Sequence, residues 1–377
     1  METRPLISII INNYNYGDFV ADAIESALHQ SYPFTEVIVV DDGSSDGSRE
    51  IILRYKNGIV PVFQENGGQA SAMNAGFNAS KGEYIIFLDA DDYLCLTAAE
   101  KVVEVLQESK AVKVHWPLRK IIDGNIVLSH TIPDARLAEG NLKDQLIKMG
   151  PSHSGGPPYG PPNSGNAWAR WYIEKIFPMP EPPFKGGADN YLFVLAPLFG
   201  EIRAIWEPLG YYRLHGKNNT LKPDYMTTFF DRYDHCCRAL SFYLHQEGID
   251  IDPSAWPRDH WYHQIYADMK EIAALVPASD SFILVDDNYW LSGDEILGRP
   301  RILFTERNGE YWGPPADDKE AILELERDRQ KGASFIVITS PAFWWLDYYT
   351  GFHDHLKNSY PCELNSDRMV VYKLTNP

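Results

Sequence analysis

Apolar and polar positions alternate along the first hundred residues in a pattern that predicts strands and helices in turn. Short apolar runs typical of buried strands are each followed by a longer segment with apolar residues three and four apart, as in an amphipathic helix. This alternation indicates right-handed βαβ units and a mostly parallel sheet with a ligand site at the strands' carboxyl ends. Strands are predicted at residues 6–11, 36–42, 59–64 and 84–89, and helices at 18–30, 48–55 and 69–80.

Polar side chains follow each predicted strand at the point where it ends. Because the carboxyl ends of parallel strands meet at one edge of a sheet, we expect these clusters to lie together. The chain has no Walker A or dinucleotide-binding glycine loop, so a cation rather than a glycine nest is expected to hold phosphates. The clusters are residues 12–15, 41–46, 66–69 and 89–92.

The sequence YIIFLDADDYL (84–94) places three carboxylates, Asp89, Asp91 and Asp92, directly after a buried strand. Three acids this close repel one another unless a positive group lies among them. Two interpretations are open at this point. One is a solvated loop at a strand end, and the other is a site for Mg²⁺ or Mn²⁺, which prefer carboxylate oxygens and bridge to phosphates.

A segment rich in proline and glycine, residues 151–187, predicts an irregular loop of the kind that forms lids or binding loops. Its aromatic side chains have two interpretations, as anchors of the loop in the core or as a platform for a sugar or lipid-linked acceptor. These side chains are Tyr159, Trp168, Trp171 and Tyr172.

The remaining chain divides into two further parts. Residues 225–275 look helical and aromatic-rich, and strand-like runs with a helix at 319–332 recur from about residue 281. The predicted organisation is a first domain at 1–222, a helical connector at 223–280 and a smaller α/β domain at 281–377, for which a docking or regulatory role is the default.

Composition restricts the class of protein. The chain has 377 residues, of which 44% are hydrophobic and 23% charged, as in soluble globular proteins of about two domains. Acidic residues exceed basic ones by 52 to 34, and the net charge of −18 argues against nonspecific nucleic-acid binding. Four cysteines without CxxC spacing, and no apolar stretch long enough to span a bilayer, favour a cytoplasmic protein and leave peripheral membrane association open.

Two stretches of the chain carry a resemblance to a known family. ISIIINNYNYGDFVADAIESALHQSYPFTEVIVVDDGSSDGS (7–48) and NGGQASAMNAGFNASKGEYIIFLDADDYL (66–94) resemble family 2 glycosyltransferases of the GT-A fold in order and spacing. The likeness covers about residues 5–220. It implies a nucleotide-sugar transferase domain with a mostly parallel mixed sheet, and a Mn²⁺ or Mg²⁺ ion held together with the donor.

The resemblance also implies roles for individual residues. In that family, the turn after the first strand and the acid of the VDDGS segment bind the nucleotide base. The DxD motif holds the ribose and the metal–diphosphate, and one helix borders the nucleotide. We expect Asp42 to meet solvent or ligand at its strand end. The implied nucleotide-sugar-binding residues are Asn12, Tyr14, Asp42, Gln69, Asn74, Asp89 and Arg213. The implied metal ligands are Asp91, Asp92 and His215.

The segment FKGGADNYLFVLAPL (184–198) resembles the part of the family that carries the catalytic base. Ala188 stands where relatives usually have Glu, and Asp189 keeps the acid. From the residues alone Asp189 is an N-cap of the helix that follows, whereas the resemblance makes it the catalytic base. The later segment GYYRLHGKNNT (210–220), with Arg213 and His215, resembles the closing Tyr-Arg-x-His of the family.

The predicted function is an inverting, metal-dependent transfer of a sugar from a nucleotide sugar to a hydroxyl of a saccharide or lipid-linked acceptor. A UDP-sugar is the favoured donor on family grounds. The alternative is a non-catalytic carbohydrate- or nucleotide-sugar-binding protein on the same fold. A phosphatase of the DxD type is disfavoured, because DADDYL lacks the Thr and Lys that such an enzyme needs.

Overall fold

The chain forms two compact units. The computed structural model describes residues 4–122, 126–133, 136–151, 160–215, 225–256, 261–286, 295–307, 310–311 and 313–374. The first unit comprises Met1–Gly216 and Thr228–Pro257, and the second comprises Lys217–Thr227 and Arg258–Pro377. None of the helices in the described ranges is long and apolar enough to cross a membrane.

The helical connector expected at 223–280 is divided between the two units. Helix α8 (Tyr225–Gln246) packs mainly on the first unit, where Tyr243 donates a hydrogen bond to the carbonyl of Lys175 and stacks edge-on against Phe199. Helix α9 (Trp261–Leu275) belongs to the second unit, and Arg299 donates to the carbonyl of Ala273 in its last turn and to that of Val276 just after it. Each helix therefore contacts the unit to which it belongs.

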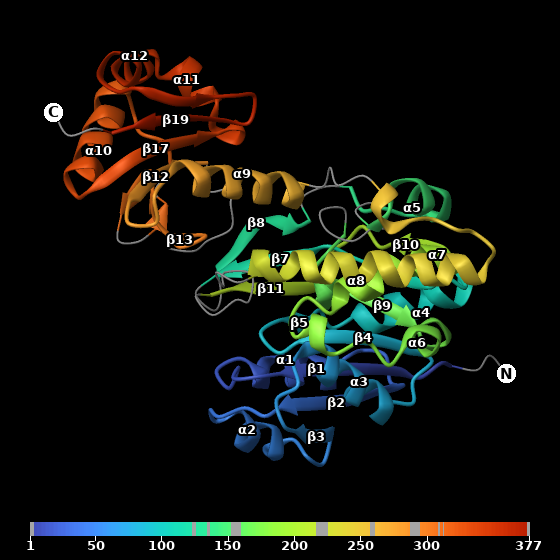
Figure 1. Cartoon of the computed structure of the whole chain (residues 1–377). Helices are drawn as coiled ribbons and strands as arrows, with labels where there is room; N and C mark the ends of the chain where they lie inside the picture. Colours follow the sequence, from blue (N-terminus) through green and yellow to red (C-terminus); the bar gives the residue numbers. More distant parts are fainter. Residues whose placement is uncertain are drawn as a thin grey trace. The chain divides into compact units, whose positions relative to one another are not determined.

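The main sheet of the first unit has seven strands among the described residues, in the order β10-β6-β9-β4-β1-β2-β3 (Figure 1). Strands β3, β2, β1 and β4 are mutually parallel, whereas β9 runs antiparallel to both β4 and β6. This confirms the predicted alternation and the mostly parallel mixed sheet. The strands are β1 (Ile7–Asn13), β2 (Thr35–Asp42), β3 (Val60–Gln64), β4 (Tyr84–Asp89), β6 (Lys113–His115), β9 (Asn166–Ala169) and β10 (Ile202–Ala204).

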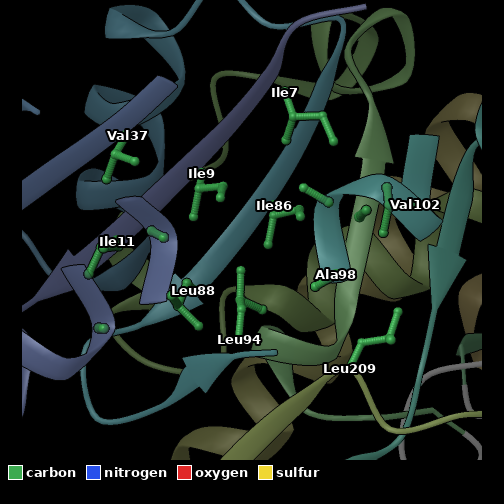
Figure 2. Packing of buried hydrophobic residues seen from close by; sticks show 14 of the residues in the cluster. Ile7, Ile9, Ile11, Val37, Ile86, Leu88, Leu94, Ala98, Val102 and Leu209 are labelled. Atoms are coloured by element: carbon green, nitrogen blue, oxygen red, sulfur yellow. The ribbon is translucent and has the colours of Figure 1, made fainter. Parts of the chain in front are cut away.

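Helices cover both faces of this sheet because the side chains of β1 alternate between them. Ile7, Ile9 and Ile11 enter a buried cluster with apolar residues of α1 and α4 (Figure 2). On the other face Ile10 meets α3, where a Cβ added at Gly76 would lie 2.3 Å from an Ile10 methyl group. Glycine therefore allows α3 to lie close to the sheet. The helices of this unit are α1 (Val20–Leu28), α2 (Ser48–Arg54), α3 (Gln69–Ala79), α4 (Ala98–Ser109), α5 (Lys143–Met149), α6 (Arg170–Ile176) and α7 (Asp189–Phe199).

The prediction that 151–187 is irregular throughout is wrong for its middle part. Strand β9 and helix α6 both lie there, because the prolines flank the apolar run NAWARWYIEKI (166–176) and do not interrupt it. Trp168 and Tyr172 are fully buried and therefore anchor the core, while Trp171 is 42% exposed. Tyr159 lies outside the described residues.

A second sheet of the first unit has the order β5-β11-β7-β8. Strand β5 directly follows the three acids of YIIFLDADDYL and pairs antiparallel with β11, which carries Arg213. This pairing returns a distant part of the chain to the acids. The strands are β5 (Tyr93–Leu94), β7 (Leu118–Ile122), β8 (Ile126–Ile132) and β11 (Gly210–Leu214).

The second unit is the predicted smaller α/β unit. Its sheet has the order β13-β14-β12-β17-β19-β18, in which β14, β12 and β17 are parallel. The predicted helix at 319–332 is α10, which starts where Asp317 accepts a capping bond from the Glu320 N–H. Its elements are β12 (Ser281–Val285), β13 (Glu295–Ile296), β14 (Arg299–Leu303), β15 (Glu306–Arg307), β16 (Glu310–Tyr311), α10 (Asp318–Gln330), β17 (Ala333–Thr339), α11 (Trp344–Tyr348), α12 (Thr350–Ser359), β18 (Cys362–Asn365) and β19 (Met369–Lys373).

Candidate active site

The register of the main sheet brings the polar ends of its central strands together. Asn12 of β1 lies opposite Asp89 of β4, and Asn13 lies opposite Asp41 of β2. Asn13 also donates a 3.0 Å hydrogen bond to the Asp41 carboxylate. The polar clusters that follow these strands therefore share one edge of the sheet, as predicted.

Asn12 and Tyr14, at the end of β1, present polar and aromatic groups that are suited to binding a ligand. Both polar atoms of the Asn12 amide are buried and have no hydrogen-bond partner within the described part of the chain. A buried polar group left unsatisfied costs about 1–3 kcal/mol, so a ligand that offers it a donor and an acceptor is favoured. Tyr14 is 45% exposed, and its ring offers an apolar face to a planar group. Both residues fit the expected contact with a nucleotide base.

Asp42 does not lie open at the end of β2, and that expectation is wrong. The residue is 3% exposed. Its Oδ1 accepts hydrogen bonds from Gln64 Nε2 at 2.6 Å and Gly67 N at 2.9 Å, and its Oδ2 accepts one from Gly68 N at 2.8 Å. The turn before α3 closes over the strand end and directs its N–H groups at the carboxylate. Asp42 thus holds the loop that starts α3, and its contact with a base stays a prediction.

Replacing Asp42 with alanine is therefore expected to lower both stability and UDP affinity. Three donors lose their acceptor, which costs on the order of 1–3 kcal/mol of unfolding free energy. In a domain of this size each kcal/mol lowers the melting temperature by about 2–4 °C. Thermal melting and calorimetric titration with UDP measure the two effects. Asp42→Asn keeps one carbonyl acceptor and is the matched control, and an unchanged melting temperature in Asp42→Ala would contradict the bracing role.

Gln69 and Asn74 of α3 contact neighbouring loops. Gln69 Oε1 accepts a 3.0 Å hydrogen bond from Ala188 N, and the Gln69 side chain also hydrogen bonds to Asp89. The Asn74 amide donates to the Met179 carbonyl at 3.0 Å and accepts from the Met179 N–H at 2.9 Å. Gln69 therefore links the acids after β4 to the start of α7. Asn74 holds the chain at Met179, which favours a positioning role over the nucleotide contact expected for it.

The acids after β4 have different surroundings. Asp92 is 1% exposed, and its carboxylate accepts hydrogen bonds from Ser164 Oγ at 2.6 Å and Arg213 N at 3.0 Å. Asp89 accepts one at 2.9 Å from the amide of Asn163. The protein thus surrounds Asp92 with its own donors, and this geometry favours a bracing role for Asp92 over the expected metal contact.

Asp91 and His215 form a pair at the edge of this cluster. His215 Nε2 lies 3.1 Å from Asp91 Oδ2, and the two side chains are 13% and 12% exposed. The His215 ring stacks on Phe19 with ring centroids 4.4 Å apart, which fixes its orientation. Carboxylate oxygens suit Mg²⁺ and Mn²⁺, and imidazole is a common metal ligand. The pair therefore brings together two of the three predicted metal ligands, from distant parts of the chain.

Arg213 braces the acids from within the protein. Its Nε donates to the carbonyl of Asp91 at 3.0 Å, and its Nη2 lies 2.7 Å from a carboxylate oxygen of Asp22. The guanidinium also lies over the Phe19 ring, 5.0 Å from the centroid. The anion that it pairs with in the structure is thus a side chain, which favours a positioning role over the expected contact with the donor.

Burial and mutual repulsion make these acids hard to ionise. Burial, and next the charges of Asp91 and Asp189, raise the pKa of Asp89. Burial, with the charges of Asp91 and Asp89, raises the pKa of Asp92 well above its ordinary value. A cation favours the ionised forms and relieves this repulsion. The described residues contain no group of three or more His, Cys, Asp or Glu side chains able to hold a metal. Asp91 and His215 would therefore be two ligands at most, and an ion such as Mg²⁺ usually takes phosphate oxygens and water as well.

Asp189 is the first residue of α7, so Ala188 and not Asp189 occupies the N-cap position of that helix. Burial raises the pKa of Asp189 to about 6, although the positive charges of Arg232 and Lys113 oppose the rise. The charge of Asp189 in turn raises the pKa of Asp89, and Gln69 holds the neighbouring Ala188 N–H at 3.0 Å. A carboxylate that titrates just below neutral pH suits a general base.

Sequence reasoning missed four residues of this site. Lys113 is fully buried in β6 and Arg232 is 3% exposed on α8, and both charges act on Asp189. Asn163 donates a hydrogen bond to the Asp89 carboxylate, and Ser164 donates one to the Asp92 carboxylate. A lysine inside the apolar run that contains β6 is a signal that points to Lys113, whereas nothing in the sequence around the other three distinguishes them from loop or surface-helix residues.

Comparison with known proteins finds a family match for part of the first unit. Residues 8–156 match the family described as Glycosyl transferase family 2. An uncharacterized glycosyltransferase of Nostoc, alr2836, is 40% identical over 217 residues, which are 56% of this chain and 66% of the relative. An uncharacterized glycosyltransferase of Rickettsia typhi, RT0329, is 37% identical over 147 residues, which are 38% of this chain and 46% of the relative.

The chain thus spans about two thirds or less of the length of these curated relatives. Among solved structures, S. aureus TarS 1–349 in complex with UDP-GlcNAc aligns with a TM-score of 0.48 and 15% identity, covering 97% of this chain and 95% of that chain. The order of the motifs, the parallel sheet and the matched family agree. Residues 8–156 of this chain therefore form a domain of glycosyl transferase family 2.

Proposed function

We propose that this protein is an inverting, metal-dependent glycosyltransferase that moves a sugar from a nucleotide sugar to a hydroxyl group of a saccharide or lipid-linked acceptor. A UDP-sugar is the favoured donor, on the resemblance of the VDDGS and DADD segments to the family. The observation that carries the proposal is that Gln69 accepts a hydrogen bond from Ala188 N at the start of α7 and acts on Asp89 at the end of β4, which joins the segment of Asp189 to the acids.

The donor side of the site rests on groups at the ends of β1 and β4. The buried Asn12 amide and the exposed Tyr14 ring are suited to the nucleotide base. Asp91 and His215 would hold Mn²⁺ or Mg²⁺ together with the diphosphate. When bound, the cation would offset the negative charge that develops on the leaving nucleoside diphosphate. Arg213, Asn163 and Ser164 keep the acids in place before the donor arrives.

The acceptor side rests on Asp189. Its carboxylate takes the proton of the acceptor hydroxyl as that oxygen bonds to the anomeric carbon and the bond from that carbon to the diphosphate breaks. Attack from the face opposite the leaving group inverts the configuration in a single displacement. The positive charges of Arg232 and Lys113 favour the ionised carboxylate that this step requires.

A polysaccharide acceptor is favoured by one relative. TuaG of Bacillus subtilis, 38% identical over 109 residues, is named a putative teichuronic acid biosynthesis glycosyltransferase. The match covers 28% of this chain and 43% of TuaG. Transfer to a growing saccharide chain is therefore the form of the reaction we propose to test first.

A panel of nucleotide sugars with and without Mn²⁺ tests the proposal. The melting temperature should rise with one nucleotide sugar, and more so when Mn²⁺ is present, because a ligand that binds only the folded state stabilises it. Turnover of that donor should then release its nucleoside diphosphate. Binding without any turnover, on saccharide acceptors or on water, would instead indicate a non-catalytic nucleotide-sugar-binding protein.

The rate of transfer should depend on pH through Asp189. The base acts only when ionised, so with a pKa of about 6 the rate is low below that pH and rises as the pH increases through it. Arg232→Met removes a charge that lowers this pKa, and the acid limb should move upward by about one pH unit. Arg232→Lys keeps the charge and is the matched control.

The midpoint of the acid limb does not depend on the amount of folded enzyme, so a partly destabilised variant still reports it. An acid limb at the same pH in Arg232→Met and the wild type would contradict the role of Arg232.

A further inference from the structure

The turn that starts α3 (residues 66–69) contacts two different parts of the site. Two of its N–H groups donate to the Asp42 carboxylate, at 2.9 and 2.8 Å. The same turn also hydrogen bonds to the segment 185–188, which leads directly to Asp189 and α7. It therefore joins the acid expected near the nucleotide base to the proposed catalytic base.

Gln69 holds the segment 185–188 at both of its ends. Its backbone N–H donates a 2.9 Å hydrogen bond to the carbonyl of Lys185, and its side-chain Oε1 accepts a 3.0 Å hydrogen bond from Ala188 N. Two bonds from one residue to points three residues apart fix both the position and the direction of the segment. Because consecutive Cα atoms lie about 3.8 Å apart, these bonds restrict where the Asp189 side chain begins.

The close approach of the turn to this segment depends on Gly68. A Cβ added there would lie 2.6 Å from the Lys185 Cα and 3.0 Å from the Lys185 carbonyl oxygen. The residue also has a φ of 90°, which glycine adopts without strain. The turn and the segment before α7 therefore pack backbone against backbone, and a side chain at this position would push them apart.

The polar groups of the Gln69 side chain are bound by the protein itself. In addition to accepting from Ala188 N, the side chain hydrogen bonds to Asp89 at the end of β4. Its carbonyl oxygen and its amide group thus already have partners, on the base segment and on the acids. This arrangement favours a role in holding other groups over the nucleotide contact expected for Gln69.

The proposed displacement requires the proton acceptor and the leaving group to lie on opposite sides of the anomeric carbon. Asp189 belongs to α7 and the acids follow β4, so a connection between these elements sets their separation. A misplacement of about 1 Å can lower a rate by about a hundredfold. We propose that Gln69 is a positioning residue that sets Asp189 at its working distance from the acids, an inference that rests on the proposed role of Asp189 as the base.

The variant Gln69→Met, which keeps the length of the side chain and removes its amide, tests the proposal in the full chain. The rate measured is release of UDP from saturating UDP-glucose, UDP-galactose or UDP-N-acetylglucosamine, with Mn²⁺ and an oligosaccharide of the same sugar. Gln69→Met should lower kcat by on the order of 10- to 100-fold. In Asp189→Asn no carboxylate remains to be positioned, so the same substitution should lower the residual rate by less than about twofold. Single turnovers with enzyme in excess over labelled donor measure the slow rates.

Two further variants control for effects on the fold. Gln64→Met removes another amide that braces the same turn, through its bonds to Asp42 and Ser71, and should change the rate by the same factor with and without the Asp189 carboxylate. Gln69→Asn keeps an amide but is one methylene shorter, so it cannot reach both partners. It should repeat the loss seen in Gln69→Met, again only when the Asp189 carboxylate is present. Melting temperatures of all variants report the amount of folded protein.

The outcomes separate this proposal from the proposed function. Equal losses for Gln69→Met in the wild type and in Asp189→Asn, or a normal kcat in both Gln69 variants, overturn the positioning role and leave Asp189 as the base. Near-normal turnover in Asp189→Asn, or a wild type that turns over none of the three donors, overturns the proposed function and the positioning role with it.

Discussion

Replacing Asp189 with asparagine is expected to lower turnover by about 10²–10⁴-fold, the usual contribution of a general base. Asparagine has nearly the same shape but cannot take a proton from the acceptor hydroxyl. The affinity for the nucleotide sugar should hardly change, because the groups suited to the donor lie at the ends of β1 and β4. Steady-state kinetics at saturating donor and acceptor, with calorimetry for the donor, measure the two quantities.

Two controls make the Asp189 experiment specific. Asp231→Asn removes one exposed negative charge next to Arg232, and it should leave turnover within about twofold, since exposed charges act weakly. The anomeric configuration of the product, read by NMR, tests the mechanism independently. Near-normal turnover in Asp189→Asn, or a product with retained configuration, would contradict the assignment of Asp189.

The periodicity of the sequence was sufficient to predict the parallel core and the convergence of polar strand ends. Each strand of β1 to β4 is a short apolar run that ends in polar residues, and the βαβ connection determines which edge those residues share. The Asn12 and Asp89 register follows from this rule. The local pattern was therefore sufficient to predict that the polar ends of β1, β2 and β4 lie together.

The parts that could not be predicted depend on contacts between distant segments. The acids of DADD look alike in the sequence, yet Ser164 and the Arg213 backbone surround Asp92, while Asp91 faces His215. Asp42 was expected to be open because no local signal shows that the turn before α3 covers it. Strand β9 was missed because it is only four residues long and lies next to a proline-rich stretch, so the sequence shows no clear strand pattern there.

These long-range contacts lead to a second prediction, which separates the acids by function. Binding of UDP or a UDP-sugar should strengthen by about tenfold or more when Mn²⁺ or Mg²⁺ replaces EDTA. Without a cation, the diphosphate approaches a cluster of carboxylates that already repel one another. Unit charges 4 Å apart interact by about 4 kcal/mol at an effective dielectric constant near 20. Even a partly screened contact between the cation and the diphosphate therefore changes the affinity for UDP by about tenfold.

The variants Asp91→Ala and Asp92→Asn should then behave differently. Asp91→Ala removes the carboxylate that faces His215 and should abolish the metal effect on UDP affinity. Asp92→Asn keeps an acceptor for the Arg213 N–H and should retain the metal effect, with a lower melting temperature as its main consequence. Calorimetric titrations of both variants in Mn²⁺ and in EDTA provide the comparison. Equal affinity of the wild type in the two buffers would exclude a metal-assisted donor site, and loss of the metal effect in Asp92→Asn alone would reverse the roles of the two acids.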